Sequence, residues 1–175
     1  MITTEDLKRV NEQLKTVDIK GKKYAQVSER IKAFREICPR GQIFTEIIDK
    51  ADGVVTMQAT IKDDNGYTLA TGLAQEKETS SFINKTSYIE NCETSAVGRA
   101  LGFVGIGVDG SFASAEEVSN AMLNQTISDK DKKVLENMVT SKGYTVEEIF
   151  PSGLDITNAQ FVEAVKKLEK IKAKA

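Results

Sequence analysis

The spacing of apolar side chains changes along the chain and separates helical from extended segments. Over residues 3–16, apolar positions recur every three or four residues, which predicts an amphipathic helix capped by Thr3 or Thr4. A Lys-Gly-Lys-Lys turn follows, and a short strand at 24–27 leads into a second helix that ends before Pro39. Two helices are therefore expected ahead of the first long strand.

After the second helix the apolar period falls to two, as in a strand with one buried face. The alternation predicts strands over 43–48, 55–62 and 67–73. The dipeptides Asp52-Gly53 and Asn65-Gly66 stand between them as turn sequences. We expect a three-stranded antiparallel meander, and its apolar face needs a cover.

A helix over 88–104 is expected to provide this cover, because its apolar positions form one stripe at 100° per residue. The stripe consists of Ile89, Cys92, Ala96, Val97, Ala100, Leu101 and Val104. The opposite side carries Asn91, Ser95, Gly98 and Gly102. Glycine inside a helix costs about 1 kcal/mol relative to alanine, so another chain segment or a ligand backbone is expected to approach this side closely.

One carboxylate interrupts the apolar stripe of this helix. Glu93 needs a partner there, and the basic helix that carries Arg30 and Arg35 is the nearest source. We interpret Glu93 as one half of a structural ion pair that fixes the fold. A catalytic carboxylate is the alternative interpretation.

The C-terminal part of the chain has helical patterns only. A helix over 115–123 and a short linker precede three capping sequences that begin at Ser128, Thr145 and Thr157. The predicted organisation is an α+β core over 1–112, a helix and linker over 113–127, and a small helical accessory domain over 128–175. The core is of β-β-β-α type with additional N-terminal helices.

Composition removes several classes of chemistry. The 175 residues include no histidine, which excludes Ser-His-Asp and Cys-His pairs and imidazole metal sites. Cys38 and Cys92 lack a metal-binding spacing and are interpreted as buried or partly buried, reduced thiols. The sequence Gly105 to Gly110 matches GxGxxG but follows a helix, unlike a dinucleotide loop. We therefore expect no catalytic residue, no cofactor and no metal.

Acidic pairs leave one enzymatic alternative, a metal-dependent nuclease. Asp63-Asp64 lies in a predicted turn and Glu116-Glu117 at a predicted helix start, and acids are common in both places without a functional role. The apolar runs are too short to cross a bilayer, and the first ten residues are charged. The expectation is a cytoplasmic protein that does not contact a membrane.

The net charge of −2 conceals a strongly uneven distribution. Residues 20–40 carry seven basic and two acidic side chains, whereas residues 41–112 carry five basic and ten acidic ones. Residues 166–174 add five lysines and one glutamate. This pattern is compatible with a cationic groove on an acidic body, and equally with charged faces that only contact solvent.

The stretch Tyr88-Ile-Glu-Asn-Cys-Glu-Thr-Ser-Ala-Val-Gly-Arg-Ala-Leu-Gly-Phe-Val-Gly-Ile-Gly resembles the signature helix of the phage and bacterial single-strand annealing proteins of the Rad fifty-two superfamily. With the order helix, meander, polar loop, helix, the resemblance covers about residues 20–112. It implies a β-β-β-α unit that assembles into rings or filaments and binds single-stranded DNA in a basic groove. Gly98 stands where eukaryotic members have Lys.

The resemblance also implies which residues contact DNA. Arg30 matches the family's arginine on the first helix, Lys85 the basic residue near the start of the signature helix, and Arg99 the arginine in its middle. Lys32 and Arg35 lie on the same basic helix as Arg30 and are included in the predicted groove. Phe82, in the polar loop, is expected either to stack on a base or to anchor its loop to the core.

The resulting expectation is an ATP-independent, non-enzymatic protein that binds single-stranded DNA as a homo-oligomer and anneals strands in phage homologous recombination and repair. The alternative is an interaction scaffold whose C-terminal helical unit recruits a host protein of replication, repair or defence. A host single-strand-binding protein is one such partner. Annealing needs phosphate contacts that leave the bases exposed for pairing, and it needs no reacting group.

Overall fold

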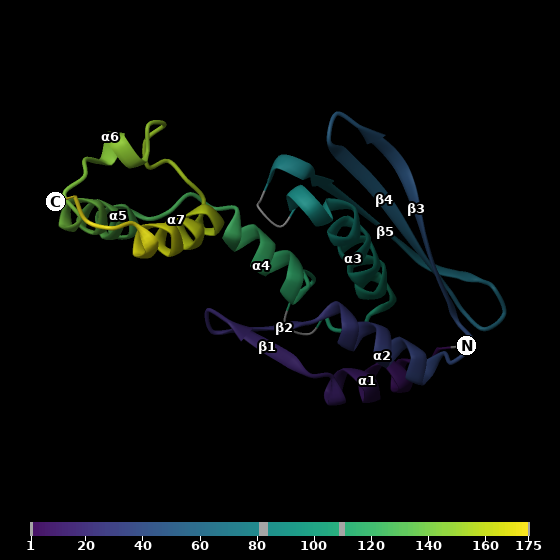
Figure 1. Cartoon of the computed structure of the whole chain (residues 1–175). Helices are drawn as coiled ribbons and strands as arrows, with labels where there is room; N and C mark the ends of the chain where they lie inside the picture. The colour runs from purple at the N-terminus through teal and green to yellow at the C-terminus, as the bar shows by residue number, and fades with distance from the viewer. Residues whose placement is uncertain (1, 81–83, 109–110, 175) are drawn as a thin grey trace. The chain divides into compact units, whose positions relative to one another are not determined.

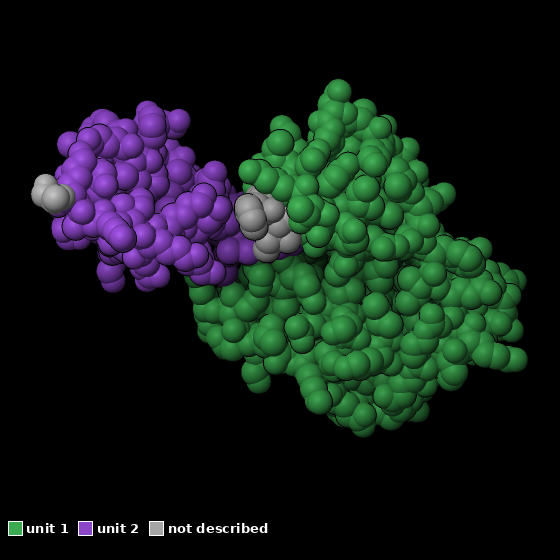
Figure 2. Space-filling view, in the orientation of Figure 1, with its two compact units in different colours: residues 1–119 green, residues 120–175 purple. Residues whose placement is uncertain are grey.

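The computed structural model describes residues 2–80, 84–108 and 111–174. They divide into two compact units, Met1–Ser119 and Asn120–Ala175, which Figure 2 shows in different colours. The predicted helix over 115–123 is confirmed as α4 (Ala115–Leu123), and the division falls within it. The first unit reaches beyond residue 112 because Glu116 and Glu117 of α4 contact residues of α2 and α3, described below.

The N-terminal helix is shorter than its apolar pattern predicts. Helix α1 (Thr4–Gln13) is capped by Thr3, whose hydroxyl accepts from the Asp6 N–H while the Asp6 carboxylate accepts from the Thr3 N–H. The chain then becomes extended and forms the hairpin β1 (Thr16–Ile19) and β2 (Lys22–Ala25). Extending the helix to residue 16 was wrong, because Thr16-Val17-Asp18-Ile19 alternates with the period of a strand.

Helix α2 (Val27–Ile37) presents one buried face to the rest of the first unit. Val27, Arg30, Ala33 and Phe34 lie on this face, at the spacing of an amphipathic helix. The backbone N–H of Val27 donates to both carboxylate oxygens of Glu116 at 3.1 Å, so a distant acid replaces a local side-chain cap.

The predicted meander is confirmed as a sheet with the order β3 (Gln42–Ala51), β4 (Val54–Lys62) and β5 (Thr68–Lys77), all neighbours antiparallel. Burial alternates along the whole of β4, which is the central strand. Both predicted turns are present: Asp52 and Gly53 have φ of 51° and 72°, and Gly66 has φ of 85°. A bulge interrupts the register between Ile47 and Asp49 in β3.

The predicted covering helix is also confirmed. Helix α3 (Asn84–Val104) follows the short 3-10 helix η1 (Glu78–Ser80) and contains a non-helical residue, Ser87, with φ of −142°. It packs mainly against β4 and β5 and leaves β3 largely uncovered (Figure 1). A Cβ on Gly72 of β5 would clash with the backbone nitrogen of Ala100, so glycine permits this close approach.

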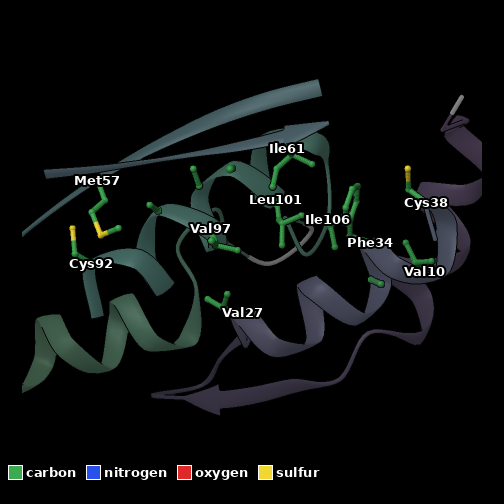
Figure 3. Close-up of a cluster of buried hydrophobic side chains, with 14 of the residues drawn as sticks. Val10, Val27, Phe34, Cys38, Met57, Ile61, Cys92, Val97, Leu101 and Ile106 are labelled. Carbon is green, nitrogen blue, oxygen red and sulfur yellow. The ribbon is translucent and has the colours of Figure 1, made fainter. Parts of the chain in front are cut away.

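The core of the first unit lies between the sheet, α3 and α2. Figure 3 shows Met57 and Ile61 of β4, Leu101 of α3 and Phe34 of α2 gathered in one cluster. All predicted stripe residues belong to it; five are buried, whereas Ile89 and Val104 are partly buried. Cys38 and Cys92 are free and buried as expected, and burial raises the pKa of both thiols.

The second unit contains the expected small helical cluster. Its helices are α5 (Asp129–Ser141), α6 (Val146–Ile149) and α7 (Asn158–Lys170). Thr145 and Thr157 form complete capping boxes, whereas Ser128 caps α5 with its hydroxyl alone. Leu135, Val139 and Leu168 form the buried centre of this unit. No helix among the described residues is long and apolar enough to span a membrane.

Candidate nucleic-acid interface

Arg30 is fully buried at 0% exposure, although it was expected to contact DNA. It projects from α2 toward α3 and the segment that follows α3. Its guanidinium donates to the backbone carbonyls of Gly98 (2.7 Å), Gly107 (3.1 Å), Phe112 (3.1 Å) and Ala113 (3.4 Å). A phosphate cannot reach this group in the folded unit. The structure therefore corrects the predicted role of Arg30, which is to hold α2 against α3 and the segment beyond it.

The environment of Arg30 is unusual because backbone carbonyls, rather than a carboxylate, accept its hydrogen bonds. Burial lowers the pKa of Arg30, while the carboxylates of Glu117 and Glu116 oppose this shift. The guanidinium nevertheless remains charged, since arginine is not deprotonated in proteins. Arg30 thus places a positive charge in the core of the first unit, where it links three backbone segments.

The side of α3 that carries Gly98 and Gly102 faces α2, and the packing around Arg30 explains why its residues are small. A Cβ on Gly98 would lie 2.7 Å from a methyl group of Val27, and a Cβ on Gly102 would lie 3.1 Å from Arg30 Nη1. Both glycines therefore admit α2 and its arginine. Of the two expected partners for this side of α3, the structure shows another chain segment.

Lys32 and Arg35 lie on the outer side of α2, away from Arg30, and both are exposed. The Lys32 ammonium is 2.5 Å from Glu29 Oε1. Arg35 donates to the carbonyl of Gly41, and its guanidinium lies 5.6 Å from the centre of the Phe34 ring. Their positive charges remain accessible to solvent, and a carboxylate neutralises one of them.

Arg99 is half-buried against the start of α4. Its Nη1 lies 3.2 Å from the Glu117 carboxylate, and its guanidinium lies 5.8 Å from the centre of the Phe112 ring. The Arg99 Nε is buried and has no hydrogen-bond partner among the residues that the structure describes. Glu117 also accepts the backbone N–H of Ser114 at 2.8 Å, which holds the carboxylate in place. The arginine of the signature helix is therefore largely satisfied within the fold.

Lys85 lies at the opposite end of α3 from Arg99. It is exposed in the first turn, ahead of the irregular residue Ser87. At 1.5 Å per residue, roughly 20 Å of helix separates Lys85 from Arg99. The structure thus does not gather the predicted residues into one groove. Phe82, expected to stack on a base or anchor its loop, lies outside the described residues.

Glu93 does not form the predicted ion pair with the basic helix. Its carboxylate is exposed and accepts a hydrogen bond from the Thr45 hydroxyl of β3 at 2.6 Å. Among the residues that the structure describes, no cation lies within salt-bridge distance of it. The correction follows from the position of α3: the helix leaves β3 uncovered, so Glu93 reaches solvent at this edge.

The side of the sheet opposite α3 is open. Phe44 of β3 is 50% exposed there, and the Lys62 ammonium lies 5.2 Å from the centre of its ring. A shallow depression of about 320 Å³ is lined by Phe44, Thr45, Glu46, Gln58, Thr60 and Lys62. This combination of an aromatic ring, amide and hydroxyl groups, one ammonium and the Glu46 carboxylate is suited to a stacked, hydrogen-bonded planar group. In the sequence, the alternation of apolar and polar residues along β3 and β4 indicated that one face of the sheet is polar and exposed.

The β1–β2 hairpin is a second feature that the predicted site residues did not include. Lys20, Lys22 and Lys23 are exposed around its turn. The charge distribution along the sequence places these lysines in the basic segment 20–40. Because strand β1 was not predicted, that distribution did not show that they belong to one hairpin. Among the described residues, no group of three or more Asp, Glu or Cys side chains is arranged to hold a metal ion.

Comparison with known proteins gives one family match. Residues 31–104 match the model of a family described as "Slr1353 N-terminal dsRNA-binding domain-like". The matched residues comprise most of α2, the complete three-stranded sheet and α3. No curated protein and no solved structure matches the chain.

Proposed function

We propose that the first unit binds nucleic acid, and that its ligand is single-stranded DNA. The observation that carries this proposal is the extent of the family match: residues 31–104 span the unit α2-β3-β4-β5-α3, and the matched family is described as dsRNA-binding domain-like. The resemblance of the α3 sequence to annealing proteins covers the same unit. Both comparisons therefore point to nucleic acid as the ligand of one packed α+β unit.

Single-stranded DNA is favoured by the chemistry of the accessible surface. Double-stranded RNA is recognised mostly by shape, through 2′-hydroxyl and phosphate contacts that span two minor grooves. Here the open sheet instead offers Phe44 beside Lys62, and a single strand can stack a base on such a ring while its phosphate meets the ammonium. Exposed Lys32, Arg35 and Lys85 supply further phosphate contacts, whereas Arg30 supplies none.

The proposed activity is strand annealing in phage recombination, without ATP and without a catalytic residue. A strand held through its phosphates keeps its base edges available for pairing. Neutralising phosphates also reduces the repulsion between two strands. The protein thus acts by positioning strands, and no bond in the DNA is made or broken.

A homo-oligomer is part of the proposal, and edge strand β3 supports it. Ile47 and Ile48 of β3 are each about half exposed, at 50% and 52%. Because an unpaired strand with exposed apolar side chains is a template for pairing with another chain, we assign this edge to contact with a second copy. Ile47→Glu is expected to lower the mass in sedimentation, whereas Tyr67→Glu, at a 75% exposed turn residue, is not.

The function is tested by titrating the full chain with labelled single-stranded DNA, duplex DNA, single-stranded RNA and duplex RNA at several salt concentrations. We expect the tightest binding to single-stranded DNA and a marked weakening with salt. Complementary strands mixed with the protein are expected to pair faster than without it. Failure to bind any of the four ligands at low salt contradicts the proposed function, and preference for duplex RNA contradicts the single-strand assignment. Cleavage of the oligonucleotide with added magnesium or manganese identifies a nuclease instead.

A groove in the second unit favours the interaction scaffold as a second candidate function. It has a volume of about 500 Å³ and an apolar floor that includes Ile149, Phe150, Ile156 and Leu168. Titration with a purified host single-strand-binding protein tests this candidate, with Ile171→Asp at the groove as the disrupting variant. Binding that this variant abolishes supports recruitment, and equal binding by both proteins excludes the groove.

A further inference from the structure

The β1–β2 hairpin combines a strained turn with an unusual density of positive charge. Its register pairs Val17 with Tyr24 and Ile19 with Lys22, so Lys20 and Gly21 form a two-residue turn. Both turn residues have positive φ, 53° for Lys20 and 80° for Gly21. Such a turn favours Asn or Gly at its first position, and lysine there carries a steric cost of roughly 1 kcal/mol.

The lysines at this turn form no ion pair within the described residues. Four lysines and one aspartate occupy residues 15–23, a net charge of +3. The aspartate, Asp18, stands opposite Lys23 in the register, and its carboxylate accepts the backbone N–H of Gly21 at 3.0 Å. In the described part of the chain, none of Lys20, Lys22 and Lys23 has a carboxylate within salt-bridge distance.

Three other cations of the first unit contrast with these lysines. Arg9 pairs with Glu36, Lys32 with Glu29, and Arg99 with Glu117. Unpaired ammonium groups repel one another, so neither turn geometry nor fold stability accounts for three lysines at the turn. Backbone strain and unpaired positive charge therefore occur together within residues 20–23, and this combination indicates a binding role.

The hairpin is also positioned to reach a ligand. Among the described strands β1 and β2 pair only with each other, and Figure 1 shows the hairpin extending away from α1 and α2. Ala25 at its base is buried, and a Cβ on Gly107 would lie 2.8 Å from the Ala25 Cβ. The base is therefore fixed to the segment after α3, while the turn lies roughly 13 Å away along the strands.

We propose that Lys20, Lys22 and Lys23 form a cationic arm that contacts the phosphates of the bound nucleic-acid strand. This inference rests on the proposed function and adds to it a contact surface outside the matched residues 31–104. An arm of three ammonium groups meets consecutive phosphates as point charges and carries no sequence preference. It supplies the accessible positive charge that buried Arg30 and paired Arg99 do not.

The test compares two triple variants of the full chain that remove the same charge. Lys20→Ala/Lys22→Ala/Lys23→Ala removes the arm, and Lys166→Ala/Lys170→Ala/Lys172→Ala removes three exposed lysines of the second unit. For three phosphate contacts on a single strand, the slope of log affinity against log salt is expected to fall by about 2, with about tenfold weaker binding at low salt. The second-unit variant is expected to keep the wild-type slope.

A further variant separates binding from folding. Lys20→Asn relieves the turn, so its melting temperature is expected to equal or exceed that of the wild type while its salt slope falls by roughly 0.7. Lys22→Arg/Lys23→Arg retains the charge and is expected to bind as the wild type does. These two variants keep the test decisive even if the alanine variant does not fold.

Each outcome distinguishes the arm from the function on which it rests. If the wild type binds no nucleic acid, the proposed function fails. If the wild type binds but the folded hairpin variants retain its affinity and slope, the arm is refuted while the function stands. Equal losses in both triple variants indicate a net-charge effect and also refute the arm. A changed oligomer mass with unchanged binding per protomer assigns the hairpin to contact between copies and overturns the proposal.

Discussion

The same basic segment contains two kinds of positive charge with opposite roles. Arg30 is fully buried and donates to four backbone carbonyls, whereas Lys20, Lys22 and Lys23 surround an exposed turn and pair with no carboxylate in the described structure. Each of these four side chains adds one positive charge to residues 20–40. The difference shows that a local charge count measures how much charge is present but not how much a ligand can reach.

The largest expected effect comes from removing the buried charge. Arg30→Ala leaves buried carbonyls without donors and opens a cavity between α2 and α3, so the free energy of unfolding is expected to fall by about 3 kcal/mol or more. Urea unfolding followed by circular dichroism measures this loss. Lys32→Ala on the exposed side of the same helix is the control, with a change within about 0.5 kcal/mol.

This prediction also separates structure from binding. At a temperature where Arg30→Ala remains folded, its affinity for single-stranded DNA per folded molecule is expected to match the wild type. A full-stability Arg30→Ala protein that binds DNA weakly would reverse the roles assigned to Arg30 and the hairpin lysines.

A smaller effect is expected from the close approach beside Arg30. Gly98→Ala places a Cβ 2.7 Å from a Val27 methyl group, and overpacking of this kind typically costs about 1–3 kcal/mol. Better helix propensity offsets part of this cost, so we expect a net loss of about 1 kcal/mol in urea unfolding. Thr94→Ala, on the exposed side of α3, is the control. A stabilised Gly98→Ala protein would show that α2 and α3 do not pack as tightly as described.

The smallest effect tests the intermediate case, a half-buried and paired cation. Glu117→Gln removes the carboxylate partner of Arg99, and the freed positive charge is expected to tighten binding of single-stranded DNA about threefold at low salt. Glu136→Gln in the second unit changes the net charge equally and serves as the control. Fluorescence anisotropy measures both. An equal gain in the two variants would mean that Arg99 stays inaccessible without its partner.

Elements with a strong local signal agree with their predictions. The meander followed from period-two alternation around Asp52-Gly53 and Asn65-Gly66, and the caps at Thr145 and Thr157 form the expected reciprocal hydrogen bonds. Strand β1 was missed because Val17 also continues the apolar spacing of the preceding helix. Residues 16–19 are compatible with the apolar spacing of a helix and with that of a strand. Their pairing with β2 makes them a strand.

The predicted site agreed less well, because accessibility depends on segments far along the chain. Residues 98–113 provide the carbonyls around Arg30, and Glu117 neutralises Arg99. Glu93 was expected to pair inside the apolar stripe, yet the placement of α3 over β4 and β5 leaves it exposed beside Thr45. None of these contacts can be predicted from hydrophobic periodicity or from the distribution of charge along the chain.

The sequence by itself determined the order of the meander and its covering helix, the turns of the meander and the capping boxes at Thr145 and Thr157, because these depend mainly on interactions within a few residues. It also determined that positive charge concentrates in residues 20–40. Only the tertiary structure decided which of those charges a ligand can reach. Burial is set by contacts across 68 to 83 residues, as between Arg30 and its carbonyl partners, and local patterns carry no information about such contacts.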